Sequence, residues 1–155
     1  MDKNVKNWFK SQLKLIEIEV FSFCNRKCWF CPNSYIDRKS DTVLLPETAY
    51  LSILDQLREI DYDQEITYSR YNEPLSKKEI ILKRISQARE YLPKAKLRTN
   101  TNGDYISLDY IHQLRDAGLN ELFIQQYLGN KQTYDHVRLK EIMIKKIEDL
   151  GVDYS

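Results

Sequence analysis

The chain has 155 residues, of which 42% are hydrophobic and 30% charged, a composition typical of one soluble domain with its own core. Its formal net charge of +1 excludes the strong basic field expected of a protein that binds nucleic acid or a membrane surface through charge. No apolar run approaches the roughly 20 residues of a membrane helix, and the polar N-terminus lacks the apolar core of a secretory signal. We therefore expect a cytoplasmic protein with no nucleic-acid or membrane partner.

The first predicted element is a strand within residues 13–23 (LKLIEIEVFSF). Ile16, Ile18 and Val20 alternate there with Glu17 and Glu19, which is the period-two pattern of a strand with one apolar face. All three cysteines of the chain follow directly, in residues 24–31 (CNRKCWFC).

Helices and strands then alternate along the rest of the chain. Helical spacing of apolar residues predicts helices within 44–60, 76–92, 107–118 and 131–151. Strands are predicted within 64–74, 96–104 and 121–129, and residues 152–155 (VDYS) resemble the start of a fifth strand. This order gives four βα units, which favours parallel strands in either an open α/β sheet or part of a barrel.

The polar face of the predicted strands favours the barrel. Arg98, Asn100 and Asn102 alternate with Leu97 and two threonines, whereas strands covered on both faces usually read as continuous apolar runs. A polar inner face fits a wide, partly open barrel whose lumen holds a ligand. Polar, turn-like loops follow the four strands (CNRKCWFC, YNEP, TNGD and YLGN), at the strand ends that carry function in such folds.

The spacing Cys-x3-Cys-x2-Cys of Cys24, Cys28 and Cys31 indicates a metal site rather than a disulfide, because three cysteines are an odd number and the expected compartment is reducing. A closed zinc site takes four ligands, and His112 and His136 lie on predicted helices far from the loop. A [4Fe–4S] cluster usually takes four cysteines, so three would leave one iron open to another ligand.

These motifs resemble those of the radical S-adenosylmethionine (radical SAM) superfamily. The cysteine spacing with an aromatic Phe30 before the last cysteine is the most specific match. The segment YNEP (71–74) resembles the Gly-Gly-Glu-Pro motif of that family, and TNG (101–103) resembles a motif after its third strand. A weaker match runs from YLGN to YDHVR and ends in Tyr134, Asp135 and Arg138. The resemblance covers about residues 13–155.

The resemblance implies an α/β fold that is a partial (βα)6 barrel. Cys24, Cys28 and Cys31 would each bind one iron of a [4Fe–4S] cluster, and S-adenosylmethionine would chelate the fourth iron through its amino and carboxylate groups. One electron from an external donor such as flavodoxin or ferredoxin would then cleave the cofactor to a 5′-deoxyadenosyl radical, which abstracts hydrogen from an unknown peptide or small-molecule substrate. No catalytic side chain is assigned.

Cofactor contacts follow from the same resemblance. We expect backbone carbonyls around Asn72 and Glu73 to contact the methionine ammonium, and Phe30 to meet the adenine. Asn72 stands where the family has glycine, and its tolerance of left-handed backbone makes the exchange plausible. Ribose or carboxylate contacts are expected from these polar residues: Asn100, Asn102, Gln125 and Gln126. Strand parity favours Gln125 and the family alignment favours Gln126, so both stay open.

Residues 1–155 are expected to form one radical SAM core with residues 1–12 as a lead-in, and the chain to be a fragment of a longer enzyme because it stops as a fifth strand begins. Arg26 and Lys27, inside the cysteine loop, would raise the cluster potential or balance its charge. The alternative hypothesis is a non-catalytic module that holds zinc or a structural cluster in the cysteine loop and binds a protein partner.

Overall fold

The computed structural model describes residues 2–127 and 133–151. Four parallel strands form one sheet in the order β1-β2-β3-β4. The strands are β1 (Leu15–Glu17), β2 (Glu65–Thr67), β3 (Lys96–Thr101) and β4 (Glu121–Ile124). The α-helices are α1 (Lys3–Gln12), α2 (Glu47–Glu59), α3 (Lys78–Tyr91), α4 (Leu108–Asp116) and α5 (His136–Asp149), and two 3-10 turns are η1 (Pro32–Ser34) and η2 (Pro74–Ser76).

This arrangement confirms the predicted α/β class and the four successive βα units. Strand neighbours in the sheet are also neighbours in sequence, as expected of a barrel that is built one unit at a time. The alternating segment 13–23 forms a shorter strand than predicted, because ladder pairing with β2 covers residues 15–17. The fifth strand expected at 152–155 lies outside the described residues.

The strand register separates two faces of the sheet. Glu17, Thr67, Arg98 and Glu121 form one row of paired positions, and paired residues of parallel strands point to the same side. Ion pairs join this face, between Arg98 and Glu65 (3.0 Å) and between Lys96 and Glu121 (2.8 Å). The predicted polar face is therefore the lumen side of the sheet.

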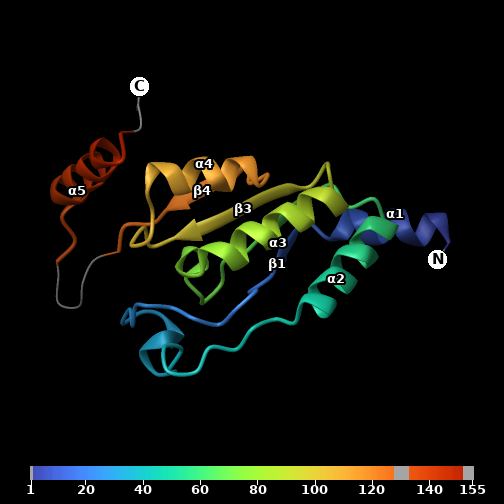
Figure 1. Ribbon diagram of the computed structural model, residues 1–155, viewed down its shortest axis with the longest axis horizontal. Helices are drawn as coiled ribbons and strands as arrows, with labels where there is room; N and C mark the ends of the chain where they lie inside the picture. The colour runs from blue at the N-terminus through green and yellow to red at the C-terminus, as the bar shows by residue number, and fades with distance from the viewer. Residues whose placement is uncertain (1, 128–132, 152–155) are drawn as a thin grey trace.

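The opposite face packs against the helices. Ile66 and Leu97 are fully buried and lie under Leu54 of α2 and Ile81 of α3, in one hydrophobic core. Helix α3 contacts β3 and lies between α2 and α4 (Figure 1). This core fixes α2, α3 and α4 on one side of the sheet and leaves the polar face available to a ligand.

A buried polar pair crosses the same core. The hydroxyl of Tyr50 donates to the Arg84 carbonyl (2.7 Å) and lies 3.0 Å from the Tyr68 hydroxyl. Burial raises the pKa of Tyr50 to about 12, so its proton remains available for this bond. The Arg84 side chain covers the Tyr50 ring from a buried position that the helical pattern did not predict.

Within the lead-in, residues Lys3–Gln12 form helix α1, which the sequence analysis did not assign. Asp2 caps α1 by accepting from the Asn4 amide (2.8 Å). Lys10 pairs with Asp63 (2.7 Å), and Lys6 donates to the Glu59 carbonyl (2.8 Å), so α1 lies against the loop between α2 and β2. No helix in residues 2–127 and 133–151 has the length and apolarity needed to cross a membrane.

The strand-end loops gather at one end of the molecule. In Figure 1 the β3 arrowhead points toward the end where the segment after β1 projects, whereas α1 lies at the opposite end. The short extension of β1 holds that segment in place, since the Ser22 and Leu45 amides donate to the carbonyls of Val43 (2.9 Å) and Val20 (3.0 Å). The cysteine loop is thereby placed beside the C-terminal strand ends.

The core predicts a measurable stability difference between two leucines. We expect Leu54→Ala to lower the free energy of unfolding by about 2–5 kcal/mol, because the truncation opens a cavity in a packed core. Leu44→Ala is the matched control, since Leu44 is 52% exposed. Urea denaturation of both variants measures the difference, and equal losses would contradict the assignment of Leu54 to the core.

Candidate metal and cofactor site

A cavity of about 370 Å³ opens at the C-terminal ends of the strands. Its lining includes nine of the ten residues proposed from the sequence: Cys24, Cys28, Phe30, Cys31, Asn72, Glu73, Asn100, Asn102 and Gln125. Gln126 does not line it. The loops after β1, β2, β3 and β4 all contribute, so motifs up to 100 residues apart in sequence meet at one place.

The three cysteines lie in one compact loop with free thiols. Cys24 is buried, whereas Cys28 and Cys31 are partly exposed. A turn joins the last two, in which the Cys31 amide donates to the Cys28 carbonyl (2.9 Å), and the Ser34 hydroxyl then donates to the Cys31 carbonyl (2.8 Å). Burial raises the pKa of the Cys24 and Cys28 thiols, and for Cys28 this outweighs the opposite effect of the Arg26 cation.

The donor set suits an iron–sulfur cluster. Three soft thiols face one cavity, and the carboxylate beside them, Glu73, is fully engaged in hydrogen bonds to the chain. Within residues 2–127 and 133–151 no group of three His, Cys, Asp and Glu side chains is arranged to hold a single metal ion. A cubane differs from a single ion in that each thiolate binds a different iron, so its ligands stand farther apart.

The Glu73 carboxylate joins the ends of β2 and β3. It is 2% exposed and accepts from the Thr101 hydroxyl (2.6 Å) and the Asn102 amide (2.8 Å), as well as from the Leu75 amide (3.1 Å). The Glu73 amide donates to the Phe23 carbonyl (2.8 Å), just before the first cysteine. The sequence analysis expected a cofactor contact from the backbone here, and the side chain is occupied by holding the loops after β2 and β3 together.

Glu19 is a second organising carboxylate, which the sequence analysis placed on the lumen side without a role. It accepts from the amides of Tyr71 (2.5 Å) and Asn72 (2.7 Å), so it fixes the first half of the YNEP loop. It also pairs with Arg38 (3.0 Å), which follows the cysteine loop and donates to the Ser22 carbonyl (3.1 Å). The alternating pattern gave its side but not its partners, because both amides come from a distant loop.

The backbone of the YNEP loop does not need glycine. Among the described residues, Asp61 is the non-glycine residue with positive φ, so Tyr71 and Asn72 lie outside the left-handed region. The expected reason for Asn72, tolerance of that region, is therefore wrong. Its side chain instead closes the turn, since it accepts from the Arg70 amide (3.2 Å) and donates to the Tyr68 carbonyl (3.1 Å).

Asn100 and Asn102 both lie at the cavity and both have partners within the chain. Asn100 donates to the Ser69 hydroxyl (3.0 Å), a cavity residue that the sequence analysis did not single out. Asn102 is 5% exposed and donates to the side chain of Asn25 (2.9 Å) in the cysteine loop. Asn100 therefore has more freedom to bind a ligand than Asn102.

The end of β4 separates the two glutamines. Gln125 continues the lumen-facing row of Glu121 and lines the cavity, as strand parity indicated, whereas Gln126 donates to the backbone of Tyr127 (3.3 Å). The Tyr127 hydroxyl donates to Gln125, and its ring lies 5.3 Å from that of Phe30. Tyr127 was not singled out from the sequence, because no local pattern distinguishes it among 11 tyrosines.

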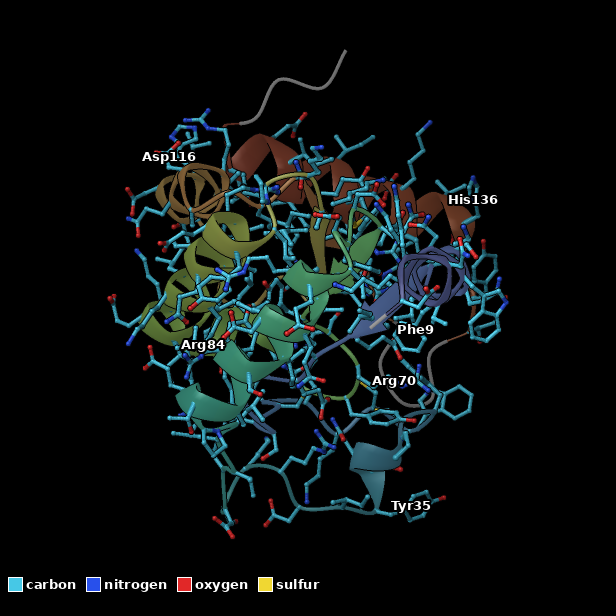
Figure 2. All side chains as sticks on the ribbon, turned by 90° about the vertical axis from the view of Figure 1, so that its right-hand side faces the viewer. Phe9, Tyr35, Arg70, Arg84, Asp116 and His136 are labelled. Atoms are coloured by element: carbon cyan, nitrogen blue, oxygen red, sulfur yellow. The ribbon has the colours of Figure 1, made fainter. Side chains whose placement is uncertain are left out.

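The remaining sequence candidates lie away from the cavity. Asp135 caps α5 by accepting from the Arg138 amide (3.0 Å), and Tyr134 and Arg138 are exposed. His112 lies in α4 and His136 begins α5, and Figure 2 shows His136 far from Tyr35 at the end of the cysteine segment. Most of the YLGN segment lies outside the described residues.

The Glu73 bonds predict a specific loss. In Glu73→Gln the amide nitrogen must replace one of the two oxygens, and in either orientation it then faces a backbone N–H donor, of Leu75 or of Asn102. We expect a loss of about 1–3 kcal/mol in the free energy of unfolding, the usual effect of an unsatisfied buried group. Glu90→Gln on exposed α3 surface is the control. Urea denaturation of both variants measures the free energy of unfolding. Equal values for the two variants would contradict the role of the Glu73 carboxylate in joining the ends of β2 and β3.

Comparisons with known proteins agree with this site. The model of the radical SAM superfamily matches residues 18–153. The S-adenosyl-L-methionine-dependent 2-deoxy-scyllo-inosamine dehydrogenase of Niallia circulans is 32% identical over 120 residues, which are 77% of this chain and 47% of that protein. The crystal structure of BtrN in complex with AdoMet and 2-DOIA superposes with a TM-score of 0.67 at 30% identity, over 81% of this chain and 49% of that one.

A second crystal structure, of selenomethionine BtrN in an open conformation, gives a TM-score of 0.66 at 31% identity, over 75% of this chain and 51% of that one. The chain thus spans about half the length of the relatives that it matches. Because the family match covers most of the chain and coincides with the cysteine loop and the strand-end cavity, the chain belongs to the radical SAM superfamily, whose cofactors are a [4Fe–4S] cluster and S-adenosylmethionine.

Proposed function

We propose that this chain forms the cofactor-binding part of a radical SAM enzyme, with Cys24, Cys28 and Cys31 as the ligands of a [4Fe–4S] cluster. The observation that carries the proposal is that all the cysteines of the sequence line one cavity together with the loops after the other three strands. Residues 1–155 would act as one core, with residues 1–12 as a lead-in that contains helix α1.

When bound, the reduced cluster and S-adenosylmethionine supply a one-electron cleavage that starts hydrogen abstraction from substrate. The chain's own residues would orient the cofactor. The Glu73 carboxylate holds the YNEP backbone so that its carbonyls can accept from an ammonium group, and Asn100 and Gln125 offer amides to a ribose or a carboxylate. Phe30 and Tyr127 present an aromatic wall suited to an adenine ring.

The substrate that we propose is a small, hydroxylated molecule rather than a peptide. The related dehydrogenase is named for 2-deoxy-scyllo-inosamine, and the related crystal structure contains 2-DOIA. The lumen-facing side chains near the cavity are polar, including Glu17, Ser69 and Asn100. Such a surface can satisfy hydroxyl groups by hydrogen bonds, which an apolar pocket could not do. The reductant would be a flavodoxin or ferredoxin in the cytoplasm.

The alternative is a zinc- or cluster-binding module without catalysis. It accounts for the cysteines alone but gives no reason for the loops after β2, β3 and β4 to place polar groups around the same cavity. A structural zinc site also requires a fourth ligand, and the chain has no further cysteine. The two hypotheses differ in the metal they require.

Anaerobic reconstitution distinguishes them. We expect a brown protein with about four irons per chain, as a [4Fe–4S] centre requires, and an electron paramagnetic resonance signal of the reduced cluster that changes on adding S-adenosylmethionine. Cys28→Ala should lose most of the bound iron, whereas Ser52→Ala on exposed α2 surface should retain it. A colourless protein with stoichiometric zinc would support the module instead.

The two glutamines provide a matched test of the cofactor site. We expect Gln125→Ala to weaken S-adenosylmethionine binding by up to about tenfold, the effect of one lost hydrogen bond, because its side chain lines the cavity. Gln126→Ala should bind normally. Equilibrium binding of S-adenosylmethionine to the cluster-loaded protein measures the affinity of both variants. A larger loss of affinity in Gln126→Ala than in Gln125→Ala would assign the contact to Gln126. Iron content serves as the control for cluster loading.

A further inference from the structure

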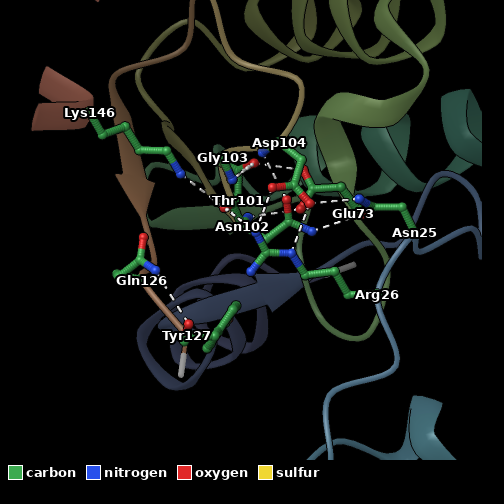
Figure 3. A network of polar contacts seen from close by, with 10 residues as sticks. All are labelled: Asn25, Arg26, Glu73, Thr101, Asn102, Gly103, Asp104, Gln126, Tyr127 and Lys146. Carbon is green, nitrogen blue, oxygen red and sulfur yellow. Dashed lines mark hydrogen bonds and ion pairs between the residues drawn. The ribbon is translucent and has the colours of Figure 1, made fainter. Parts of the chain in front are cut away.

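Asp104, in the turn after β3, reaches across to the cysteine loop. Its carboxylate accepts from the side-chain nitrogen Nδ2 of Asn25 (2.7 Å) and from two guanidinium nitrogens of Arg26, Nε (2.8 Å) and Nη2 (2.5 Å). Figure 3 shows these contacts converging on the turn. Both partners lie between Cys24 and Cys28, so every bond made by this carboxylate to a side chain fixes the segment between the first two thiols.

The neighbouring residues of the turn reinforce the same connection. Asn102 donates to the Asn25 side-chain oxygen (2.9 Å), and its carbonyl lies 3.4 Å from Arg26 Nη2 and 3.4 Å from Lys146 Nζ of α5. The Asp104 amide donates to Asn102 (3.0 Å), which keeps the carboxylate on the side of the cysteine loop. Gly103 permits the turn through its positive φ of 75°, and an added Cβ would lie 2.6 Å from Lys146 Nζ.

The contact differs from an ordinary surface ion pair. The side chains of Arg26 and Asp104 are 29% and 34% exposed, and two parallel N–H donors meet two carboxylate oxygens. Such bidentate geometry is stronger and more specific than a single exposed pair, whose contribution is usually small. The third bond, from Asn25, further restricts the carboxylate to one orientation.

The pair also controls charge beside the cavity. Arg26 lines the cavity together with Cys28, so its guanidinium would act on a cluster held there. Asp104 places an opposite charge directly on this guanidinium, and Lys146 is a further cation that acts on the same carboxylate. The sequence analysis expected Arg26 and Lys27 to raise the cluster potential or to balance its charge, and in the folded chain Arg26 is paired with Asp104.

We propose that Asp104 is a positioning residue that holds the segment between Cys24 and Cys28 in its metal-binding conformation and neutralises Arg26 beside the cluster. The second half of this inference rests on the proposed cluster. The first half concerns the metal-free chain alone, so the two can be tested separately.

The metal-free chain tests the conformational role. Cys24 is the reporter because it is buried, so alkylation by iodoacetamide at fixed pH requires the loop to open. In Asp104→Asn one amide nitrogen faces a donor of Arg26 or Asn25, and we expect Cys24 to react about tenfold faster, which corresponds to the loss of one charge-assisted bond. Arg26→Lys, which keeps the positive charge but cannot make the bidentate contact with Asp104, should also accelerate the alkylation of Cys24. Peptide mass spectrometry measures each rate.

Asp116→Asn is the matched control, because Asp116 pairs with its neighbour Arg115 on the exposed end of α4. Its Cys24 rate should equal that of the unmodified chain. Equal rates in Asp104→Asn and the unmodified chain would overturn the conformational role. Circular dichroism would reveal whether Asp104→Asn unfolds globally. In that case the milder Arg26→Lys variant is the test: faster alkylation of Cys24 supports the conformational role of Asp104, and an unchanged rate overturns it.

The reconstituted protein tests the electrostatic role through the midpoint potential of its cluster. Asp104→Asn should raise that potential, because an unpaired guanidinium stabilises the more negative reduced state. Arg26→Gln should lower it by leaving the carboxylate unpaired, and the double variant should return toward the original value. If the midpoint potentials of Asp104→Asn and Arg26→Gln shift in the same direction, or do not shift, the proposed neutralisation is overturned. A purely structural role would change the amount of bound iron without shifting the two potentials in opposite directions. If the unmodified chain binds no iron, the proposed function is rejected. The alkylation experiment on Cys24 would still test the conformational role of Asp104.

Discussion

The buried carboxylate of Glu73 is the constraint on which the site depends. It lies in the loop after β2, accepts from Thr101 and Asn102 at the end of β3, and its own amide donates to Phe23 before the cysteine loop. Glu73 thus connects three strand-end loops, two of them through its carboxylate, which is 2% exposed, and the cysteine loop through its backbone amide. A buried carboxylate is stable only when its hydrogen bonds are satisfied, so the loop after β2 needs the end of β3 to be in place.

The cysteine loop is held from two sides as a consequence. After the last cysteine, Asn33 donates to the Tyr71 carbonyl (2.6 Å) and Arg38 reaches Glu19, which itself fixes the YNEP amides. Before the second cysteine, Asn25 and Arg26 bind the turn after β3. The loop has one 3-10 turn as its regular structure, and its shape depends on these side-chain bonds. Hydrogen bonds to the loops after β2 and β3 thereby position the thiols of a short irregular segment.

The fold was largely predictable from local patterns, and the internal partners of the site were not. Alternation in residues 13–23 and 96–104 gave the strands, their faces and the polar lumen, because side-chain direction depends only on backbone period. The motifs placed Cys24 and Asn72 at the same strand-end rim. The hydrogen bonds of Glu19 and the position of Tyr127 depend on which distant loops meet, and a single sequence carries no signal for that. Asn72 was assigned the right place for the wrong reason, since its side chain rather than its backbone suits the turn.

The lumen face changes its chemistry along the strands, and this gradient favours ligand binding at one end. Toward the strand starts, Lys96 and Arg98 are paired with glutamates of neighbouring strands. Toward the strand ends, Ser69, Asn100 and Gln125 line the cavity. Each of these charges already has a partner of opposite sign on a neighbouring strand, so a ligand there would have to replace that partner. Neutral amides and hydroxyls can exchange a bond within the chain for one to a ligand at small cost, which is why binding should concentrate beside the thiols.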